Sequence, residues 1–330
     1  MSSEARQAPS PGPAPSALRA LLAKPWLWSY VAAIAVWLVT IANSRGQGAG
    51  DILVAAFTFS AFTVLVSLGQ MLVISTGPGN VDLSIPATIA LSSAVSMLVM
   101  NESAAMIVPG LLAAIGVGVL VGTFNFGLIR LLRIPPIIAT LASSLVVTSI
   151  AIAFGRGLKI KPPVPFQDFA SWKLFGAVPM LAVVALAAAL AVALVLERTV
   201  YGRSVAAVGQ NRRAAHLAGL KVERTRFITY VVSAALAGLT GALIAGFAGG
   251  NSLDQGEEYL LLTIAVVVIG GTAVAGGRAS VPGIWGAALF MFLLVAMLNS
   301  AGAGAGLRML LTGLIIIAVI TVAGGEKSAR

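Results

Sequence analysis

Cysteine is absent from the 330-residue chain, and charged residues make up only 10% of it. The absence of cysteine excludes disulfide bonds, a thiol nucleophile and a cysteine-ligated metal. A soluble domain carries roughly 25% charged residues, so this composition lies far outside the soluble range. The chain is instead 58% hydrophobic, with a mean hydropathy of +0.99. Both values are typical of a polytopic integral membrane protein.

Residues that carry catalysis or bind metals are also scarce. The single histidine, His216, cannot form a cluster of metal ligands, and no HExxH, GxSxG or paired-carboxylate pattern lies in the apolar segments. Gly271 and Gly276 have the spacing of a phosphate-binding loop, but Gly277 replaces its lysine, which argues against a nucleotide site. We therefore expect no catalytic residue, no metal and no cofactor.

Apolar segments near the roughly 20 residues needed to cross a bilayer recur along the chain. They lie near 26–42, 52–74, 83–100, 105–129, 137–154, 177–196, 227–248, 260–275, 282–300 and 307–323. The predicted fold is an all-α integral membrane bundle of about ten transmembrane helices, some of them discontinuous. A disordered cytoplasmic tail (1–24), which lacks signal-peptide features, a membrane domain (25–324) and a cytoplasmic C-terminal tail (325–330) make up the predicted domains.

The net charge of +10 has two explanations. Nucleic-acid binding is one, but in membrane proteins Lys and Arg collect on the cytoplasmic side. With ten spans and a cytoplasmic N-terminus, 15 of the 21 Lys and Arg fall on the inner side. The asymmetry favours both termini in the cytoplasm, the lipid bilayer as the surrounding medium, and no nucleic-acid partner.

Small residues recur inside the predicted spans at roughly helical spacing, as in Gly238, Gly241, Ala245 and Gly249. Such residues let membrane helices pack closely, so we expect tight helix contacts there.

The segment 197–226 holds seven of the 21 basic residues between two apolar runs. Asn211 is placed to cap a short helix over 212–218, and Gly219 is placed to end it. A cytoplasmic anchor loop explains the charge alone. A capped helix in that loop favours a second interpretation, a surface that another protein pushes on.

The sequence GPGNVDLSIP, from Gly77 to Pro86, interrupts the apolar pattern between the second and third predicted spans. Two glycines and two prolines disfavour a continuous helix, and Asp82 or Ser84 is placed to cap the next one. One interpretation is a capped turn at the cytoplasmic surface. The other is a discontinuous helix at a transport pathway, because irregular backbone and a carboxylate are tolerated at membrane depth where they face a cavity or the bundle interior.

Two outer loops carry opposite charge. Asp254, Glu257 and Glu258 lie in 249–259, and four basic residues lie in 155–176. Solvated surface is one interpretation, and docking of an extracytoplasmic partner is the other. Inside the spans, Asp82 is the main ionisable residue. An ion-coupled carrier usually needs more buried titratable groups than that. Uphill transport would then need a separate motor acting through the segment 197–226.

Four motifs in order resemble one family over residues 52–323. GNVDLSIPA, starting at Gly79, is similar to GGIDLSVGS. RIPPIIATLASS, starting at Arg133, is similar to RIPPFIATLG. The stretch GRSVAAVGQNRRAAHLAGL from Gly202 and the stretch AVVVIGGTAVAGG from Ala265 are similar to its G-R…A-x-G-x-N…A-A…G and A-V-V-L-G-G-T-S-L-A-G-G segments. Together they resemble the inner-membrane permeases of bacterial ABC importers for ribose and related sugars.

The resemblance implies a multi-pass inner-membrane permease that is not itself an enzyme. It implies three partners: a cytoplasmic ABC ATPase, an extracytoplasmic solute-binding protein and a second permease copy, identical or paralogous. The residues placed in the ATPase coupling loop are Gly202, Arg203, Gly209, Asn211, Arg212, Arg213, Ala214, Ala215 and Gly219. The chain departs from the family pattern where Asn80 replaces a glycine and Ile85-Pro86 replaces Val-Gly.

The predicted function is import of a sugar, a monosaccharide such as a pentose or a related polyol, driven by the separate ATPase. Asn80, Asp82 and Ser84 are the predicted pathway residues, and Asp254, Glu257 and Glu258 the predicted docking residues for the binding protein. The alternatives are a branched-chain amino acid permease of the same machinery, and an ion-coupled carrier or intramembrane enzyme, which would need polar groups that the spans lack.

Overall fold

The structure is a computed structural model that describes residues 24–324 except 45, 158 and 303. The predicted tails, apart from Lys24, lie outside the described residues. The helices that lie along the bundle are α2 (Pro25–Asn43), α3 (Ala49–Ser75), α4 (Ile85–Met100), α5 (Ile107–Leu131), α6 (Pro136–Gly155), α8 (Met180–Arg198), α11 (Val222–Ala248), α12 (Tyr259–Ile269), α13 (Val281–Ser300) and α14 (Ala305–Gly324).

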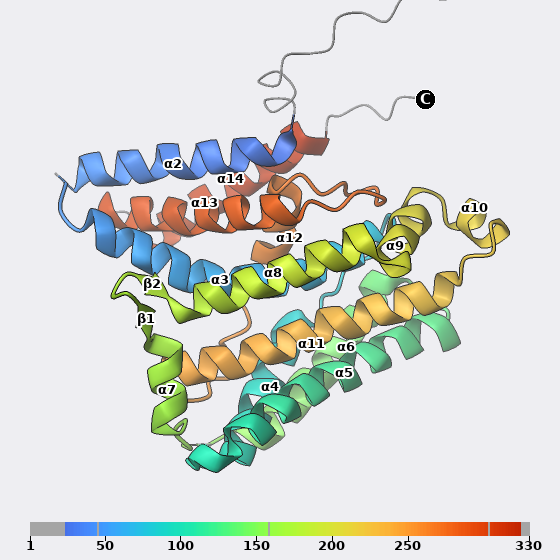
Figure 1. Ribbon diagram of the computed structural model, residues 1–330, viewed down its shortest axis with the longest axis horizontal. Helices are drawn as coiled ribbons and strands as arrows, with labels where there is room; N and C mark the ends of the chain where they lie inside the picture. The colour runs from blue at the N-terminus through green and yellow to red at the C-terminus, as the bar shows by residue number, and fades with distance from the viewer. Residues whose placement is uncertain (1–23, 45, 158, 303, 325–330) are drawn as a thin grey trace, which may run out of the picture.

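The remaining elements are short and lie in the connections. They are the 3-10 turn η1 (Ala104–Met106), α7 (Val164–Ser171), the antiparallel strands β1 (Lys173–Leu174) and β2 (Val178–Pro179), α9 (Val200–Gln210) and α10 (Arg212–Leu217). Figure 1 shows α9 and α10 at one end of the bundle, and α7 with the strands at the other. The basic segment and the hairpin are thus on opposite ends.

The bundle is layered, and α3 and α11 are its most buried long helices. In Figure 1, α2 and α13 lie side by side on one flank, α3 and α8 in the middle, and α11 with α5 on the other flank. The most apolar window of α3 is 67% buried within the chain and that of α11 is 61% buried, against 22% for α8. Leucines and valines on α8 instead face outward, as lipid-facing side chains do.

Seven helical segments within the described residues are long and apolar enough to cross a membrane: Trp26–Asn43, Ala49–Ser75, Ala104–Leu131, Pro136–Gly155, Met180–Arg198, Val222–Ala248 and Val281–Ser300. Two further apolar helices, α4 and α12, have only 16 and 11 residues. These two cannot cross about 30 Å of hydrocarbon alone, at 1.5 Å per residue. The protein is therefore an all-α polytopic membrane protein. Among its described residues, the two apolar helices α4 and α12 are too short to span the membrane by themselves.

The helix lengths follow one order twice along the chain. From α2 to α6 they are 19, 27, 16, 25 and 20 residues. Over α8 and then α11 to α14 they are 19, 27, 11, 20 and 20 residues. The short helix holds third place in both halves. A repeated order of helix lengths need not be accompanied by a repeated sequence, because many different apolar side chains can face lipid.

Glycines let the central helices meet at their backbones. A Cβ on Gly238 of α11 would lie 2.3 Å from the carbonyl oxygen of Ala114, and one on Gly241 would lie 2.4 Å from that of Ile89. On the facing side, a Cβ on Gly118 of α5 would lie 2.1 Å from the carbonyl oxygen of Ala234. The prediction of close packing is therefore confirmed at Gly238 and Gly241, which fix α11 against α4 and α5. It is wrong for Gly249, which follows the end of α11 and where a Cβ would have only Gln167 within 4 Å.

Candidate functional site

The connection between α3 and α4 runs through the protein without helical structure. The chain leaves α3 at Ser75 and resumes a helix at Ile85, with Pro86 in the first turn, where its missing N–H is no loss. Gly77 and Gly79 have φ angles of +126° and +76°, which glycine adopts without steric strain. The predicted interruption is confirmed, and α4 is a short helix that starts inside the bundle.

Asp82 lies at the N-terminal end of α4 and is only 1% exposed. Its Oδ1 accepts hydrogen bonds from the backbone N–H of Ser84, at 3.0 Å, and from the Ser84 hydroxyl, at 2.6 Å. The Ser84 side chain itself makes no capping bond to the helix. The partial positive charge of the helix N-terminus also favours a carboxylate at this place.

Three further helices each contribute one polar side chain around this carboxylate. Gln70 of α3 accepts the backbone N–H of Asp82 at 3.2 Å, and Thr140 of α6 accepts that of Leu83 at 3.1 Å. Asn125 of α5 donates to the Ser84 hydroxyl at 2.7 Å. We call these five residues the polar site: Gln70, Asp82, Ser84, Asn125 and Thr140. All are at most 1% exposed, so the site lies inside the helix bundle.

The depth of the polar site follows from α11. Ser233 faces the Asp82 carboxyl and lies about 16 Å along the helix from Val222, at 1.5 Å per residue. Within the described residues, three side-chain atoms of the polar site are buried without a hydrogen-bond partner: Gln70 Nε2, Asp82 Oδ2 and Asn125 Oδ1. Burying such polar atoms is costly unless a partner reaches them. The arrangement therefore suits contact with a solute or water that can both donate and accept hydrogen bonds.

The acidic loop 249–258 also packs on the short helix α4. Gly256 packs on Pro86, where a Cβ would lie 2.3 Å from the proline carbonyl oxygen. Ser93 of α4 donates to Asn251 at 2.8 Å and to Gln255 at 3.0 Å. The loop is thus seated on α4.

The predicted docking residues Asp254, Glu257 and Glu258 are exposed on that loop. Partial burial raises the pKa of the Glu258 carboxyl above its usual value, and a hydrogen bond with Tyr259 offsets part of that rise. The three carboxyl groups therefore lie at the surface of a segment that packs directly on α4.

The basic segment 197–226 folds into two helices, each with a side-chain cap. Thr199 accepts the backbone N–H of Gly202 at 3.2 Å at the start of α9, and Asn211 accepts that of Ala214 at 2.9 Å at the start of α10. Gly219 follows α10 with a φ of +81°, as a helix-terminating glycine does. The capped helix predicted over 212–218 is confirmed as Arg212–Leu217.

The predicted coupling residues divide into an exposed and a buried set. The exposed set is Arg203, Asn211, Arg212, Arg213, Ala214 and Gly219, and the buried set is Gly202, Gly209 and Ala215. Ala215 packs with Val208 and Val222, which attaches α10 to α9 and α11. On α9, the Tyr201 hydroxyl lies 2.9 Å from that of Thr229, and burial raises the pKa of Tyr201. A buried scaffold thus presents cationic side chains outward.

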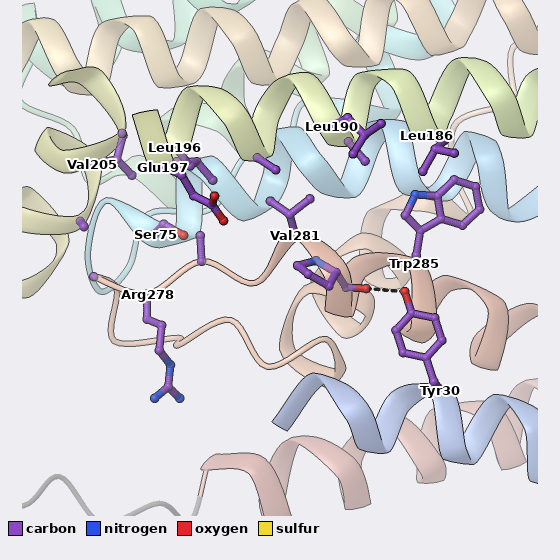
Figure 2. A pocket seen from close by; sticks show the side chains of 17 residues that line it. Tyr30, Ser75, Leu186, Leu190, Leu196, Glu197, Val205, Arg278, Val281 and Trp285 are labelled. Atoms are coloured by element: carbon purple, nitrogen blue, oxygen red, sulfur yellow. Dashed lines mark hydrogen bonds between the residues drawn. The ribbon is translucent and has the colours of Figure 1, made fainter. Parts of the chain in front are cut away.

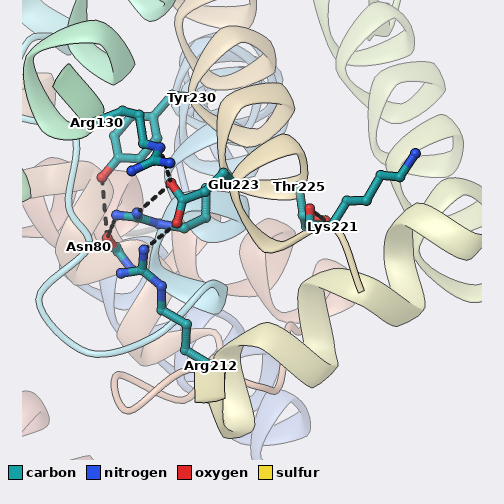
Figure 3. Close-up of polar contacts among 8 residues, drawn as sticks. Asn80, Arg130, Arg212, Lys221, Glu223, Thr225 and Tyr230 are labelled. Atoms are coloured by element: carbon teal, nitrogen blue, oxygen red, sulfur yellow. Dashed lines mark hydrogen bonds and ion pairs between the residues drawn. The ribbon is translucent and has the colours of Figure 1, made fainter. Parts of the chain in front are cut away.

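Glu223, in the first turn of α11, gathers three arginines (Figure 3). It pairs with Arg212 of α10, with Arg130 at 3.7 Å and with Arg226 at 3.5 Å. Arg226 is 4% exposed and also donates to Asn80 at 3.2 Å. The predicted pathway residue Asn80 therefore contacts the basic segment rather than the polar site.

A cavity of about 540 Å³ lies beside α9, between α8, α13 and the start of α2 (Figure 2). Its walls are mostly apolar, as with Leu186, Leu190 and Trp285, and the Tyr30 hydroxyl donates to the carbonyl of Pro282 at 2.8 Å. None of the polar-site residues lines it. The start of α2 is thus at the end of the bundle that carries α9.

Sequence reasoning missed Gln70 and Asn125 of the polar site, and the buried position of Arg226. Gln70 and Asn125 are isolated polar residues within long apolar runs, which is the signal that would have identified them. Arg226 was counted only as one of seven basic residues, although it is almost fully buried. No sequence pattern shows that burial.

Comparison with known proteins identifies the family. The model of the branched-chain amino acid transport system / permease component family matches residues 52–320. The "Autoinducer 2 import system permease protein LsrD" of Photorhabdus laumondii is 30% identical over 296 residues, which cover 87% of both chains. LsrC of an Enterobacter species is 28% identical over 313 residues, 94% of this chain and 90% of the relative.

A third relative, the "Probable ABC transporter permease protein y4mJ" of Sinorhizobium fredii, is 30% identical over 269 residues, 81% of this chain and 79% of the relative. No solved structure matches. The matched residues include the polar site and the segment 197–226. The chain belongs to the branched-chain amino acid transport system / permease component family, and it is a multi-pass inner-membrane ABC permease subunit rather than an enzyme.

Proposed function

We propose that this permease imports a sugar, a monosaccharide such as a pentose or a related polyol, which a binding protein delivers and a separate ATPase drives. The observation that carries the proposal is the polar site. Amide, hydroxyl and carboxyl groups converge there inside the bundle, and one nitrogen donor and two oxygen acceptors are left without partners among the described residues. A solute with several hydroxyl groups would satisfy them, whereas an apolar solute would leave them unpaired.

In this proposal Asp82 and Ser84 face the route of the solute at the start of α4, and Asn80 holds the turn that precedes them. The two short helices, α4 and α12, support a route for the solute near the start of α4. Helices that start within the membrane are typical of sites where a transporter handles its solute, because their backbone ends are protected inside the bundle.

Coupling to the ATPase is proposed for the segment 197–226. Arg203, Arg212 and Arg213 are exposed cations on a scaffold that is held by Gly202, Gly209 and Ala215. An exposed capped helix that buried small residues attach to the core is suited to transmit movement of the ATPase to the membrane helices.

Topology and assembly follow from the same proposal. In the ten proposed crossings, the non-helical segments 76–84 and 270–280 complete the paths of α4 and α12. With both termini in the cytoplasm, most basic residues then lie inside, and the cavity that α2 shares with α9 supports this orientation. The loop with Asp254, Glu257 and Glu258 then faces outward, where the binding protein docks. A second permease copy completes the assembly.

A branched-chain amino acid is the second candidate solute, because the family description names it. An apolar side chain would need an apolar recess next to the polar site. The described cavities with apolar walls are lined by other residues. The polar site therefore favours the sugar.

The test is binding of candidate monosaccharides, polyols and branched-chain amino acids to the cognate binding protein, followed by uptake into proteoliposomes that hold the whole importer. We expect sugar uptake that depends on ATP. Uptake by the permease without its ATPase, or a binding protein specific for amino acids, would contradict the proposal.

Charge reversal tests the coupling surface. Arg212→Glu with Arg213→Glu should weaken ATPase association about tenfold or more, because rim charges facing a complementary partner govern association. Co-purification of the ATPase and its stimulation by loaded binding protein measure this. Lys173→Glu, on the hairpin at the other end of the bundle, is the control for co-purification of the ATPase. Normal assembly and transport in the double variant would show that the segment 197–226 does not contact the ATPase.

A further inference from the structure

Asn80 stands where the sugar-permease motif has glycine, and its side chain has a specific use. Its Oδ1 accepts from Arg226 at 3.2 Å and from the Tyr230 hydroxyl at 3.5 Å. Its Nδ2 donates to the carbonyl of Gly77 at 3.2 Å, which closes the turn ahead of Asp82. One amide group therefore links α11 to the backbone of the interrupted segment (Figure 3).

The same link continues outward to α10. The Arg226 guanidinium, which is 5% exposed, lies 3.5 Å from Glu223, and Glu223 pairs with Arg212 at the start of α10. A buried guanidinium is costly to leave without partners, so Arg226 holds Asn80 and Glu223 together. A movement of α10 that draws Glu223 away changes the partners of Arg226, and thereby those of Asn80.

A second contact joins the two regions through backbone alone. Gly209, at the end of α9, packs on Ser75 and Gly277, and Gly276 packs on Gly77, where a Cβ would lie 2.5 Å from its Cα. The Gly277 N–H donates to the Ser75 carbonyl at 2.9 Å. The basic segment therefore contacts residues 75–80 through both Gly209 and Arg226, and Gly276 and Gly277 pack beside them.

We propose that Arg226 and Asn80 are positioning residues that transmit the displacement of α10 to the turn carrying Asp82, and so tie ATP hydrolysis to movement of the start of α4. This rests on the proposed role of 197–226 as the ATPase contact. Neither residue touches the solute; each acts by setting the place of the polar site.

The experiment is a double-mutant cycle on the complete importer in proteoliposomes. The single variants are Asn80→Gly, which installs the residue of the sugar-permease motif, and Arg226→Met, which keeps a long apolar stem. The double variant completes the cycle, and Asn80→Asp retains an oxygen that faces Arg226. Arg133→Gln, at an exposed position after α5 and outside the segment 197–226, controls for loss of a positive charge. Solute taken up per ATP hydrolysed is measured together with the amount of assembled complex.

Each single variant should lower uptake per ATP about tenfold, within the usual range of coupling between sites. The double variant should be no worse than the worse single variant, because both break one link. Asn80→Asp and Arg133→Gln should keep the wild-type ratio. A merely structural role would lower the yield of complex and leave the ratio unchanged.

Single variants that keep the wild-type ratio, or losses that multiply in the double variant, would overturn the inference. The proposed function fails differently. If charge reversal at Arg212 and Arg213 leaves ATPase association intact, the contact surface itself is wrong. The two failures are therefore distinguishable in the same preparation.

Discussion

Gly209 is the position where one added carbon should do the most damage to the contact between the basic segment and the membrane core. A Cβ there would lie 2.0 Å from the Ser75 carbonyl oxygen, 2.2 Å from the Gly277 nitrogen and 2.8 Å from the Gly277 Cα. All three atoms belong to backbone, so no side-chain rotation relieves the clash. Gly209→Ala therefore forces α9 to move away from residues 75–77.

The magnitude follows from the size of that movement. Relief of the overlap needs a separation of about 1 Å in an interior packed without voids. Overpacking of this kind costs about 1–3 kcal/mol, and loss of the 2.9 Å hydrogen bond from Gly277 to Ser75 adds about 1 kcal/mol. The expected destabilisation of the purified permease is thus about 2–4 kcal/mol.

The assay is the fraction of detergent-purified permease that remains monodisperse after heating for a fixed time, because membrane proteins unfold irreversibly. Gly127→Ala is the matched control, since its Cβ meets nothing within 4 Å in the helix α5. The control should be as stable as the wild type or slightly more stable, because alanine favours a helix. A Gly209→Ala permease with the heat resistance of the control would refute the packing described between α9 and residues 75–77.

Two further substitutions test the local structure. Asp82→Asn keeps an oxygen for Ser84 but removes the charge, so uptake should fall while the complex still assembles; Asp82→Ala also loses the hydrogen bonds and should cost about 1–3 kcal/mol in heat resistance. Full uptake by both variants would exclude Asp82 from the route. Asn211→Ala removes the cap of a six-residue helix, costing about 1 kcal/mol, and should weaken ATPase co-purification, whereas Asn211→Ser retains the cap and the association. Equal co-purification by both would show that the cap is dispensable.

Local signals in the sequence predicted local structure closely. The Asn211 cap and the Gly219 terminator bound α10 within one residue, because both act through hydrogen bonds and φ angles of their own neighbours. The apolar segments likewise predicted the ends of the helices along the bundle within about five residues, apart from the C-terminal end of α12. The predicted helix ends at 275, whereas α12 ends at Ile269, where Gly270 and Gly271 follow it.

Elements without a strong apolar or capping pattern were missed. The helix α9 has a polar and an apolar face over only 11 residues, and α7 and the two strands are shorter still. Such elements gain most of their stability from packing against the bundle, which a sequence pattern does not record. The coupling residues were therefore located as a loop, whereas the structure places several of them on two helices.

Contacts between distant parts of the chain lay furthest from prediction, and Asn80 shows why. From the motif it was a departure from glycine and a predicted pathway residue. In the structure it accepts a hydrogen bond from Arg226, 146 positions away in sequence, and that arginine looked like one more cytoplasmic charge. Burial distinguishes it from Arg224, two residues earlier and exposed. Both arginines contribute equally to the charge asymmetry that orients the chain, but only Arg226 is placed to act on the turn before Asp82. Orientation can therefore be inferred from the number of charges, whereas coupling depends on which of them the fold removes from water.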